Sequence, residues 1–249
     1  KKITEVEAQN KLEKFRKINS EYLYPSFDTI AGSGKNGAIV HYRAKKGSCR
    51  VIKKNDIFLC DSGGQYTYGT TDVTRTISFS KTNRNIKDIF TRVLKGHIAV
   101  VNTNLNKDKI GKKIDLRARK FLKQKNLDYN HGTGHGVGNF LGVHEGPQSL
   151  SKRSISETIK EGMILSNEPG YYKKSKFGIR LENLLLVKKS SYKNFLEFDN
   201  LTLVPFEKKL IDKHELNNIQ INWLNSYHKQ VFQIISKYLS TELINWLKD

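Results

Sequence analysis

Residues 61–76 read DSGGQYTYGTTDVTRT, and this stretch carries the clearest fold signal in the chain. An apolar run precedes it within residues 51–61, and the Gly63-Gly64 step supplies a bend, so the pattern predicts two neighbouring strands of a bent hairpin. Asp61 and Asp72 would lie on those two strands. Both stand beside apolar strand residues, where an unpaired carboxylate is costly to bury and a bound cation offsets that cost.

Three later segments place similar chemistry along the chain. HGTGHGVG covers residues 131–138, SNEPGYY covers 166–172 and GIRLEN covers 178–183. Two divalent cations need more negative charge than one carboxylate supplies, and carboxylates can bridge cations while leaving positions open for water and substrate. Four acids and one imidazole therefore predict a two-metal hydrolytic centre. The candidate ligands are Asp61, Asp72, His135, Glu168 and Glu182.

Taken one at a time, these residues have ordinary structural explanations. An Asp beside Gly or Thr is favoured in turns, Glu168 can end a strand, and Glu182 can pair with Arg180. Arg180 and Glu182 are two apart on a predicted strand, so their side chains share a face. We interpret Arg180 as an arginine that holds a ligand carboxylate. Jointly, the five residues favour the metal hypothesis over the separate explanations.

Two other types of site fit the glycine-rich histidine segment poorly. His131 and His135 have the i, i+4 spacing of helical zinc ligands, but Gly-Thr-Gly breaks a helix and no Glu follows His131. A dinucleotide-binding loop needs an apolar strand before it, whereas residues 124–130 (QKNLDYN) are polar. A mononuclear zinc site and a nucleotide site are therefore both disfavoured.

Composition narrows the class of protein. The length of 249 residues suits one large domain. The longest apolar runs, such as residues 184–187, fall far short of the roughly 20 residues of a membrane helix, so we expect a soluble protein with no membrane partner. Cys49 and Cys60 give no disulfide framework, so we expect a reducing compartment, the cytoplasm. The net charge of +20 is spread over the whole chain, so nucleic acid is not the expected partner.

Local patterns predict the remaining elements. Thr4 and Glu7 form a capping box that opens a helix, and apolar residues at intervals of three and four predict a helix over 86–101. Glycine costs a helix up to about 1 kcal/mol per residue, so residues 132–142 should form a loop or bulged strand. We also predict strands over 37–43, 163–168 and 178–187, a helix over 114–126 and a helical tail over 213–239.

These motifs resemble the pita-bread metallopeptidase family and, within it, the eukaryotic-type X-Pro aminopeptidases (aminopeptidase P). The resemblance extends over essentially the whole chain. Prolidases and methionine aminopeptidases are similar in the ligands but differ around the histidines; their activities are the alternatives, as is a non-catalytic family member that acts as a binding module. The longer matching stretches are YPSFDTIAGSGKNGAIVHY at 24–42, HGTGHGVGNFLGVHEGP at 131–147, LTLVPFEKKLID at 201–212 and WLNSYH at 223–228.

The resemblance implies an α+β fold in which a curved antiparallel sheet has two pseudo-symmetric halves and helices on its outer face. Residues 1–206 would form the catalytic domain. Residues 207–249 would form a C-terminal helical extension of that domain, through which such enzymes assemble as homodimers. Family members carry two further N-terminal domains, and the chain starts with Lys1-Lys2 rather than Met. We therefore expect its start to be a cut or a processing point.

The resemblance also implies two metal sites that share ligands. Asp61 and Asp72 would hold one metal with Glu182, while Asp72, His135, Glu168 and Glu182 would hold the other. Two Mn²⁺ ions are the usual assignment in the family, and Zn²⁺ or Co²⁺ can occupy such sites; ligation by carboxylates is consistent with manganese. A hydroxide that bridges the metals would be the nucleophile.

The implied substrates are peptides with proline at the second position, cut before the proline. Glu168 would shuttle a proton towards the leaving nitrogen. His131 and His144 would flank the scissile bond, and His144 would stabilise the tetrahedral intermediate. His41 would help to bind the substrate. Tyr172 and Arg180 are secondary candidates for the same task.

Overall fold

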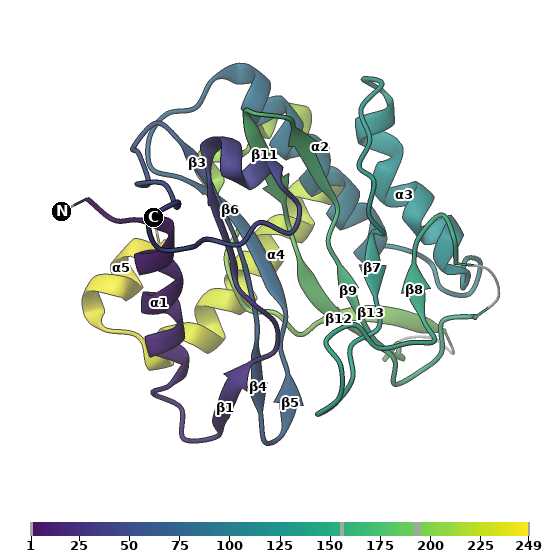
Figure 1. Cartoon of the computed structure of the whole chain (residues 1–249). Coiled ribbons are helices and arrows are strands. Elements are labelled where there is room, and N and C mark those ends of the chain that lie inside the picture. Colours follow the sequence, from purple (N-terminus) through teal and green to yellow (C-terminus); the bar gives the residue numbers. More distant parts are fainter. Residues whose placement is uncertain (1, 155–156, 192–194, 249) are drawn as a thin grey trace.

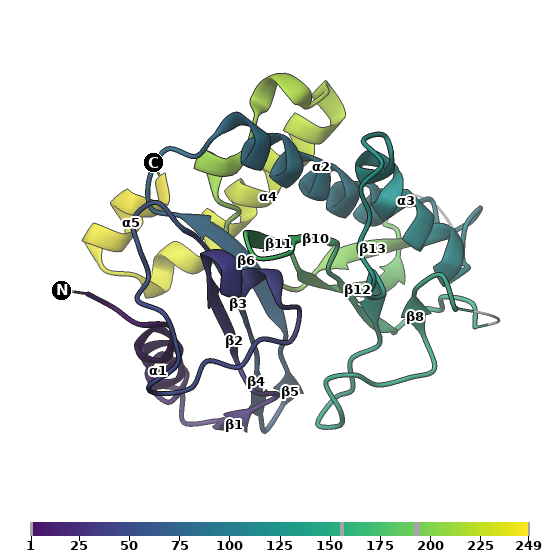
Figure 2. The ribbon, with the colours of Figure 1, turned by 45° about the horizontal axis from the view of Figure 1, so that its top comes forward.

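The computed structural model describes residues 2–154, 157–191 and 195–248. Two groups of antiparallel strands lie side by side, and helices pack against them (Figure 1). The helices are α1 (Glu5–Arg16), α2 (Arg84–Val101), α3 (Gly111–Lys123), α4 (Asn218–Ile235) and α5 (Thr241–Lys248), with short 3₁₀ helices η1 (Gly34–Ala38), η2 (Lys208–Leu210), η3 (Lys213–Glu215) and η4 (Ser236–Tyr238). Figure 2 shows α2, α3 and α4 on the same face of the strands. No helix in the described part of the chain is long and apolar enough to cross a membrane.

The first group of strands contains the predicted hairpin. Asp61 pairs with Thr74, and Asp72 immediately precedes the strand that contains Thr74, so the hairpin prediction is confirmed. Gly63 is required at the bend, because a Cβ atom there would lie 1.9 Å from the Thr71 carbonyl oxygen. One sheet has the order β2 (Ile30–Ser33), β3 (Ile57–Ser62), β6 (Val73–Ser78), and a second has the order β1 (Tyr22–Pro25), β4 (Gly64–Tyr66), β5 (Gly69–Thr70).

The second group of strands carries the two glutamates. The predicted strands over 163–168 and 178–187 do pair, but the structure divides this region further, into two separate antiparallel pairs that meet at Pro169-Gly170. A three-stranded sheet has the order β13 (Leu196–Asn200), β12 (Asn183–Lys189), β9 (Ile164–Asn167); the two-stranded sheets are β10 (Gly170–Lys173) with β11 (Phe177–Arg180), and β7 (Gly134–His135) with β8 (Ser149–Leu150).

The strand predicted over residues 37–43 is wrong. Residues 34–38 form η1, and residues 39–44 have no regular structure. Gly37 packs tightly over β11: a Cβ atom on Gly178 would lie 1.7 Å from the Gly37 carbonyl oxygen. This close contact between segments far apart in the sequence holds the backbone in a compact turn, and the local apolar pattern gives no sign of it.

The predicted helices are present with small shifts of their ends. α1 begins with the predicted capping box, in which Thr4 and Glu7 exchange hydrogen bonds of 2.8 and 3.2 Å. α2 and α3 correspond to the predicted helices over 86–101 and 114–126. The tail predicted over 213–239 is helical mainly in α4, which is followed by η4 and then by α5.

One apolar core joins α2 to the C-terminal helix. Leu224, Tyr227 and Val231 of α4 belong to the same buried cluster as Phe90 and Leu94 of α2. α4 is therefore built on the core of the strands and α2. A division of the chain into domains at residue 206 stays a prediction.

Arg75 in β6 is a buried cation that connects the two groups of strands, which are the two halves of the fold, to the C-terminal segment. Its guanidinium packs on the Phe206 ring, 4.2 Å from the ring centroid. Burial lowers the pKa of Arg75, and among the described residues it has no carboxylate within ion-pair distance. It donates instead to the carbonyl oxygens of Thr74 (2.9 Å), Glu182 (2.5 Å), Val204 (2.6 Å) and Pro205 (3.0 Å), to Asn183 Oδ1 (2.7 Å) and to the Tyr227 hydroxyl (3.1 Å).

Replacing Arg75 with Met is expected to lower the free energy of unfolding by about 3 kcal/mol or more, because several buried acceptors lose their donors at once. Urea denaturation followed by circular dichroism measures this change. Arg153→Met is the matched control, since Arg153 is exposed and its loss should change stability by less than about 0.5 kcal/mol. Equal midpoints for the two variants would contradict the role of Arg75.

Candidate metal centre

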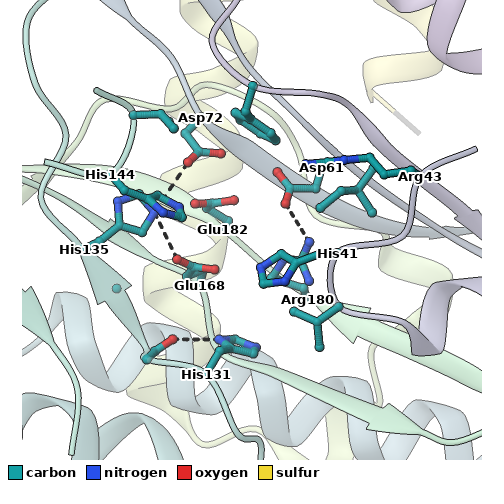
Figure 3. A pocket seen from close by; sticks show the side chains of 16 residues that line it. His41, Arg43, Asp61, Asp72, His131, His135, His144, Glu168, Arg180 and Glu182 are labelled. Carbon is teal, nitrogen blue, oxygen red and sulfur yellow. Dashed lines mark hydrogen bonds and ion pairs between the residues drawn. The ribbon is translucent and has the colours of Figure 1, made fainter. Parts of the chain in front are cut away.

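The five predicted ligands meet in one pocket of about 500 Å³ (Figure 3). They come from both groups of strands. Asp61 lies in β3, Asp72 directly before β6, His135 in β7, Glu168 directly after β9, and Glu182 between β11 and β12. The halves join here by a hydrogen bond of 3.1 Å from the Glu182 amide to the Thr74 carbonyl oxygen.

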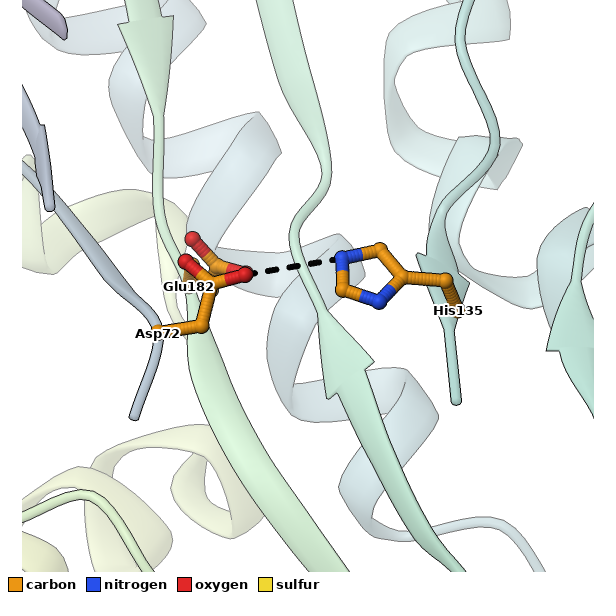
Figure 4. A group of neighbouring side chains, drawn as sticks. All are labelled: Asp72, His135 and Glu182. Carbon is orange, nitrogen blue, oxygen red and sulfur yellow. Dashed lines mark ion pairs between the residues drawn. The ribbon is translucent and has the colours of Figure 1, made fainter. Parts of the chain in front are cut away.

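Three of these side chains are close enough to share one ion. Ligand atoms of Asp72, His135 and Glu182 all lie within 4.8 Å of one another (Figure 4). His135 Nε2 is 3.6 Å from Asp72 Oδ2 and 3.2 Å from Glu168 Oε1, so Glu168 adjoins this group. Asp61 Oδ1 is buried and has no hydrogen-bond partner among the described residues.

The carboxylates repel one another in this site. Burial, followed by the charges of Glu168 and Asp61, raises the pKa of Glu182 to about 8. Burial and the charge of Glu182 also raise the pKa of Asp72 well above its ordinary value. Burial acts to raise the pKa of Glu168 as well, but the hydrogen bond and charge of His135 outweigh it and hold that pKa at about 2.

His135 is the partner that ionises with Glu168. Burial acts to lower the pKa of His135, but Glu168 outweighs burial and raises it to about 9. This imidazolium and the Arg180 guanidinium, which pairs with Asp61, supply two positive charges against four clustered carboxylates. The unsatisfied Asp61 oxygen and the mutual repulsion therefore fit divalent cations, and a donor set rich in oxygen with one nitrogen suits hard or borderline metals.

Arg180 holds Asp61 rather than Glu182. Its Nη2 donates to Asp61 Oδ2 at 2.6 Å, and its Nε donates to the Thr74 hydroxyl at 3.1 Å. Thr74 in turn donates to Glu182 Oε2 at 2.6 Å. Arg180 therefore holds a carboxylate of the predicted ligand set, but that carboxylate is Asp61 and not Glu182, the acid that stands beside Arg180 in the sequence. That Asp61 binds a metal stays a prediction. Thr74 was not identified from the sequence, because nothing local marks a threonine in a strand as a partner for a glutamate 108 residues away.

His131 has both ring nitrogens engaged within the protein. Nδ1 lies 2.7 Å from the Gly132 carbonyl oxygen, which can only accept, so Nδ1 carries the hydrogen. Nε2 then accepts from the Tyr172 hydroxyl at 2.8 Å, and that hydroxyl accepts from Arg180 Nη1 at 2.6 Å. Burial lowers the pKa of His131, consistent with a neutral ring. Tyr172 therefore lies behind His131, and the structure does not place it among the residues that line the pocket.

His144 and His41 line the pocket more openly. The His144 ring lies 4.0 Å from the His135 ring, centroid to centroid. Burial and the neighbouring charge of His135 lower the pKa of His144, so its ring is neutral at neutral pH. No hydrogen bond occupies its ring nitrogens among the described residues. His41 lies across the pocket from His135 and His144 (Figure 3).

The loop that carries His131 and His135 is anchored by side chains of α3. Arg119 and Asp115 form a buried ion pair at 2.8 Å. Arg119 also donates to the His131 carbonyl oxygen at 2.6 Å, and Asp115 accepts from the Thr133 hydroxyl at 2.7 Å. Gly134 is required beside this loop, because a Cβ atom there would lie 1.9 Å from the Ser166 carbonyl oxygen. The predicted loop or bulged strand is confirmed, whereas its anchors on α3 were not predicted.

Several residues of the pocket wall were not predicted either. Apolar side chains of Phe27, Ile30, Val40 and Val143 line one part of it, and Arg43 lines it near His41. Apolar residues of this kind are common in any sequence, so only the fold identifies them as wall residues.

Comparisons with known proteins place the chain in a family. Residues 1–189 match the model of metallopeptidase family M24, and residues 194–249 match the model of the C-terminal region of peptidase M24. A probable Xaa-Pro aminopeptidase P from Phaeosphaeria nodorum is 45% identical over 99% of the chain and 39% of the relative. Aminopeptidase P2 from Arabidopsis thaliana is 46% identical over 95% of the chain and 34% of the relative. The chain thus spans about 40% of the length of such relatives.

Solved structures agree with this result. An X-prolyl aminopeptidase from Caenorhabditis elegans, described as a cytosolic enzyme with a di-nuclear active site, has a TM-score of 0.92 and 37% identity over 99% of the chain and 42% of its own. A prolidase from Pyrococcus furiosus has a TM-score of 0.69 and 30% identity over 79% of the chain and 55% of its own. The predicted α+β pita-bread fold is thereby confirmed, and the chain belongs to metallopeptidase family M24.

Proposed function

We propose that this chain carries the catalytic centre of a metal-dependent aminopeptidase that hydrolyses the peptide bond between an N-terminal residue and a following proline. The observation that supports it most is the meeting of four carboxylates and His135, from both halves of the fold, in one pocket that His41 and His144 also line. The relatives named as Xaa-Pro aminopeptidases support the choice of bond.

We propose that Asp61, Asp72 and Glu182 hold one divalent cation, and that Asp72, His135, Glu168 and Glu182 hold a second. Mn²⁺ is our first choice, because oxygen donors dominate the set. When bound, the two cations would supply a water that is deprotonated near neutral pH as the nucleophile, and they would polarise the scissile carbonyl.

Residues of the protein would then transfer the proton of the attacking water and stabilise the negative charge that develops on the scissile carbonyl oxygen. Glu168 faces the pocket beside His135, and we assign it the transfer of a proton from the attacking water to the proline nitrogen, which must be protonated to leave as an amine. His144 has no competing hydrogen bond among the described residues, so we assign it the donation of N–H to the oxyanion. His131 is committed to Gly132 and Tyr172, so we assign it a role in shaping the pocket beside the scissile bond.

The apolar wall suits the residue after the scissile bond. Proline has no backbone N–H and its ring is rigid. A proline ring therefore loses little by leaving water for the surface of Phe27, Ile30 and Val143, which line the pocket. The four clustered carboxylates form the acidic floor of the pocket, and this floor would attract the N-terminal ammonium group of the peptide.

A direct comparison of peptides tests the proposed reaction. After chelation and addition of Mn²⁺, the chain is expected to cleave Xaa-Pro-Xaa tripeptides in preference to Xaa-Pro dipeptides and to Met-Ala peptides. Cleavage of the dipeptides alone would indicate prolidase activity, and cleavage of the Met-Ala peptides alone would indicate methionine removal. A chain that binds but cuts none of them would be a binding module.

Replacing Glu168 with Gln is expected to lower kcat by about 10²–10⁴-fold, because general acid-base catalysis contributes a factor of this size. The far-ultraviolet circular dichroism spectrum should be unchanged, since the amide has the shape of the carboxylate. Glu161→Gln is the matched control: its carboxylate is half-exposed and pairs with Lys189 at 3.3 Å. Near-normal turnover by Glu168→Gln, with cations bound, would remove Glu168 from the proton transfer.

We also propose that the protein acts in the cytoplasm and forms a homodimer through its C-terminal helices. The support for the dimer is the exposure of Leu243 and Trp246 on α5, at 47% and 66%. Light scattering coupled to size-exclusion chromatography measures the mass in solution, and a monomer at micromolar concentration would contradict the dimer.

A further inference from the structure

Arg43 is the one pocket arginine that a bound ligand can reach among the described residues. The other arginine that lines the pocket, Arg180, is 2% exposed, and its nitrogens are committed to Thr74, Tyr172 and Asp61. The side chain of Arg43, in contrast, is 41% exposed. Its guanidinium therefore lies where the pocket opens to water.

The attachment of Arg43 to the protein is weak. Its Nε lies 3.5 Å from Asp28 Oδ2, and its Nη1 donates to the Asp28 carbonyl oxygen. The Asp28 side chain is 85% exposed, and an ion pair so open to water contributes little. A carboxylate from a ligand can therefore compete with Asp28 for the planar fork of the guanidinium.

The position of Arg43 makes the distribution of charge in the pocket asymmetric. Arg43 and His41 lie on the same side of the pocket as Asp61, across from His135 and His144 (Figure 3). The floor is acidic, Val40 adds apolar surface next to His41, and Arg43 adds a positive charge at the exposed edge. A peptide has an ammonium group at one end and a carboxylate at the other. The acidic floor attracts the first and Arg43 repels it, so the two charges favour one orientation.

We propose that Arg43 is a specificity-determining residue that binds a carboxylate on the leaving-group side of the scissile bond. This inference rests on the proposed aminopeptidase reaction. In a peptide Xaa-Pro-Xaa the terminal carboxylate lies two residues beyond the scissile bond, roughly 7 Å away in an extended chain, within the span of a pocket this size. The enzyme would therefore prefer short peptides with a free C-terminus, or peptides with an acidic side chain at the third position.

Three peptides separate the two sources of the carboxylate: Ala-Pro-Ala, Ala-Pro-Ala amide and Ala-Pro-Asp amide. With Mn²⁺ added, the chain should show a kcat/KM about 2–5-fold higher for the free acid than for Ala-Pro-Ala amide, mainly through a lower KM, as one partly exposed charge pair would give. Arg43→Gln should bring this ratio close to one. Asp28→Asn should increase it, because the competing carboxylate is gone. A rate for Ala-Pro-Asp amide above that for Ala-Pro-Ala amide would show that Arg43 also binds an acidic side chain at the third position.

Binding of the leaving fragment gives a readout that does not depend on turnover. Calorimetric titration with Pro-Ala and with Pro-Ala amide should show tighter binding of the free acid, lost in Arg43→Gln and retained in the control Arg153→Gln. If no peptide is cut while this difference in binding holds, the proposed reaction fails, and only the binding of a carboxylate by Arg43 stands. Equal kcat/KM and equal binding for the acid and amide forms, or a preference that persists in Arg43→Gln, would overturn the inference.

Discussion

Removal of divalent cations is expected to abolish peptide hydrolysis and to lower the melting temperature by roughly 10–20 °C. Each of the two proposed cations, at 100 times its dissociation constant, stabilises the folded state by about 2.7 kcal/mol, and a chain of this size shifts by about 2–4 °C per kcal/mol. The physical cause is the repulsion that raises the pKa values of Asp72 and Glu182 when no cation separates them. Scanning fluorimetry and tripeptide hydrolysis, before and after dialysis against a chelator, measure both effects.

Restoring Mn²⁺ should recover both properties together. The control is a variant that lacks a shared ligand, Asp72→Asn, whose melting temperature should respond weakly to Mn²⁺. An unchanged melting temperature and full activity in chelator would show that the carboxylate cluster does not hold the catalytic metal.

The Asp72→Asn substitution is itself expected to have opposite effects on activity and on stability. Activity should fall by at least about 10³-fold, because the residue that contacts both proposed cations is lost. In chelator, however, the variant should be more stable than the original chain by about 1 kcal/mol, since a neutral amide no longer repels Glu182 and Asp61. Urea denaturation in chelator measures the difference. A loss of stability of several kcal/mol would mean that Asp72 has a structural role apart from metal binding.

The same cluster sets the pH dependence of the cation-free chain between pH 6.5 and 8. The folded pKa of Glu182 is about 8, above its ordinary value of 4.5, so its contribution to stability is complete below pH 4.5 and is lost as pH rises towards 8. His135, raised from 6.5 to about 9, contributes with the same sign. Stability in chelator should therefore fall as pH rises across this window, and Mn²⁺ should reduce the fall.

The sequence predicted what local patterns determine. The glycine bend after Asp61 and the strand order around it follow from neighbouring residues, so the meeting of Asp61 and Asp72 was predictable. The period of three and four along α2 reflects one buried face, which any helix of this kind needs. The five candidate ligands were identified because each stands in an unusual local context, and the fold brings all five to one pocket.

The remainder depends on contacts between distant segments. The turn at residues 34–38 replaces a predicted strand because Gly37 meets Gly178. Arg180 bonds Asp61 across the two halves, 119 residues away, although Glu182 is the acid next to it in the sequence. Arg43 stands two residues after His41 in the sequence, but nothing there separates it from the many other basic residues of the chain, and its exposed position in the pocket is what gives it a role.

The contacts of Arg75 determine whether this chain can be divided into two independent parts. The two family models meet between residues 189 and 194, as if two parts had been joined. Yet one guanidinium donates both to the Glu182 carbonyl oxygen, before that boundary, and to Val204 and Pro205, after it. Deleting the second part would expose a charged core residue directly behind a proposed metal ligand. Arg75 also donates to Tyr227 in α4, so we expect that the two parts can be exchanged between relatives only as a pair.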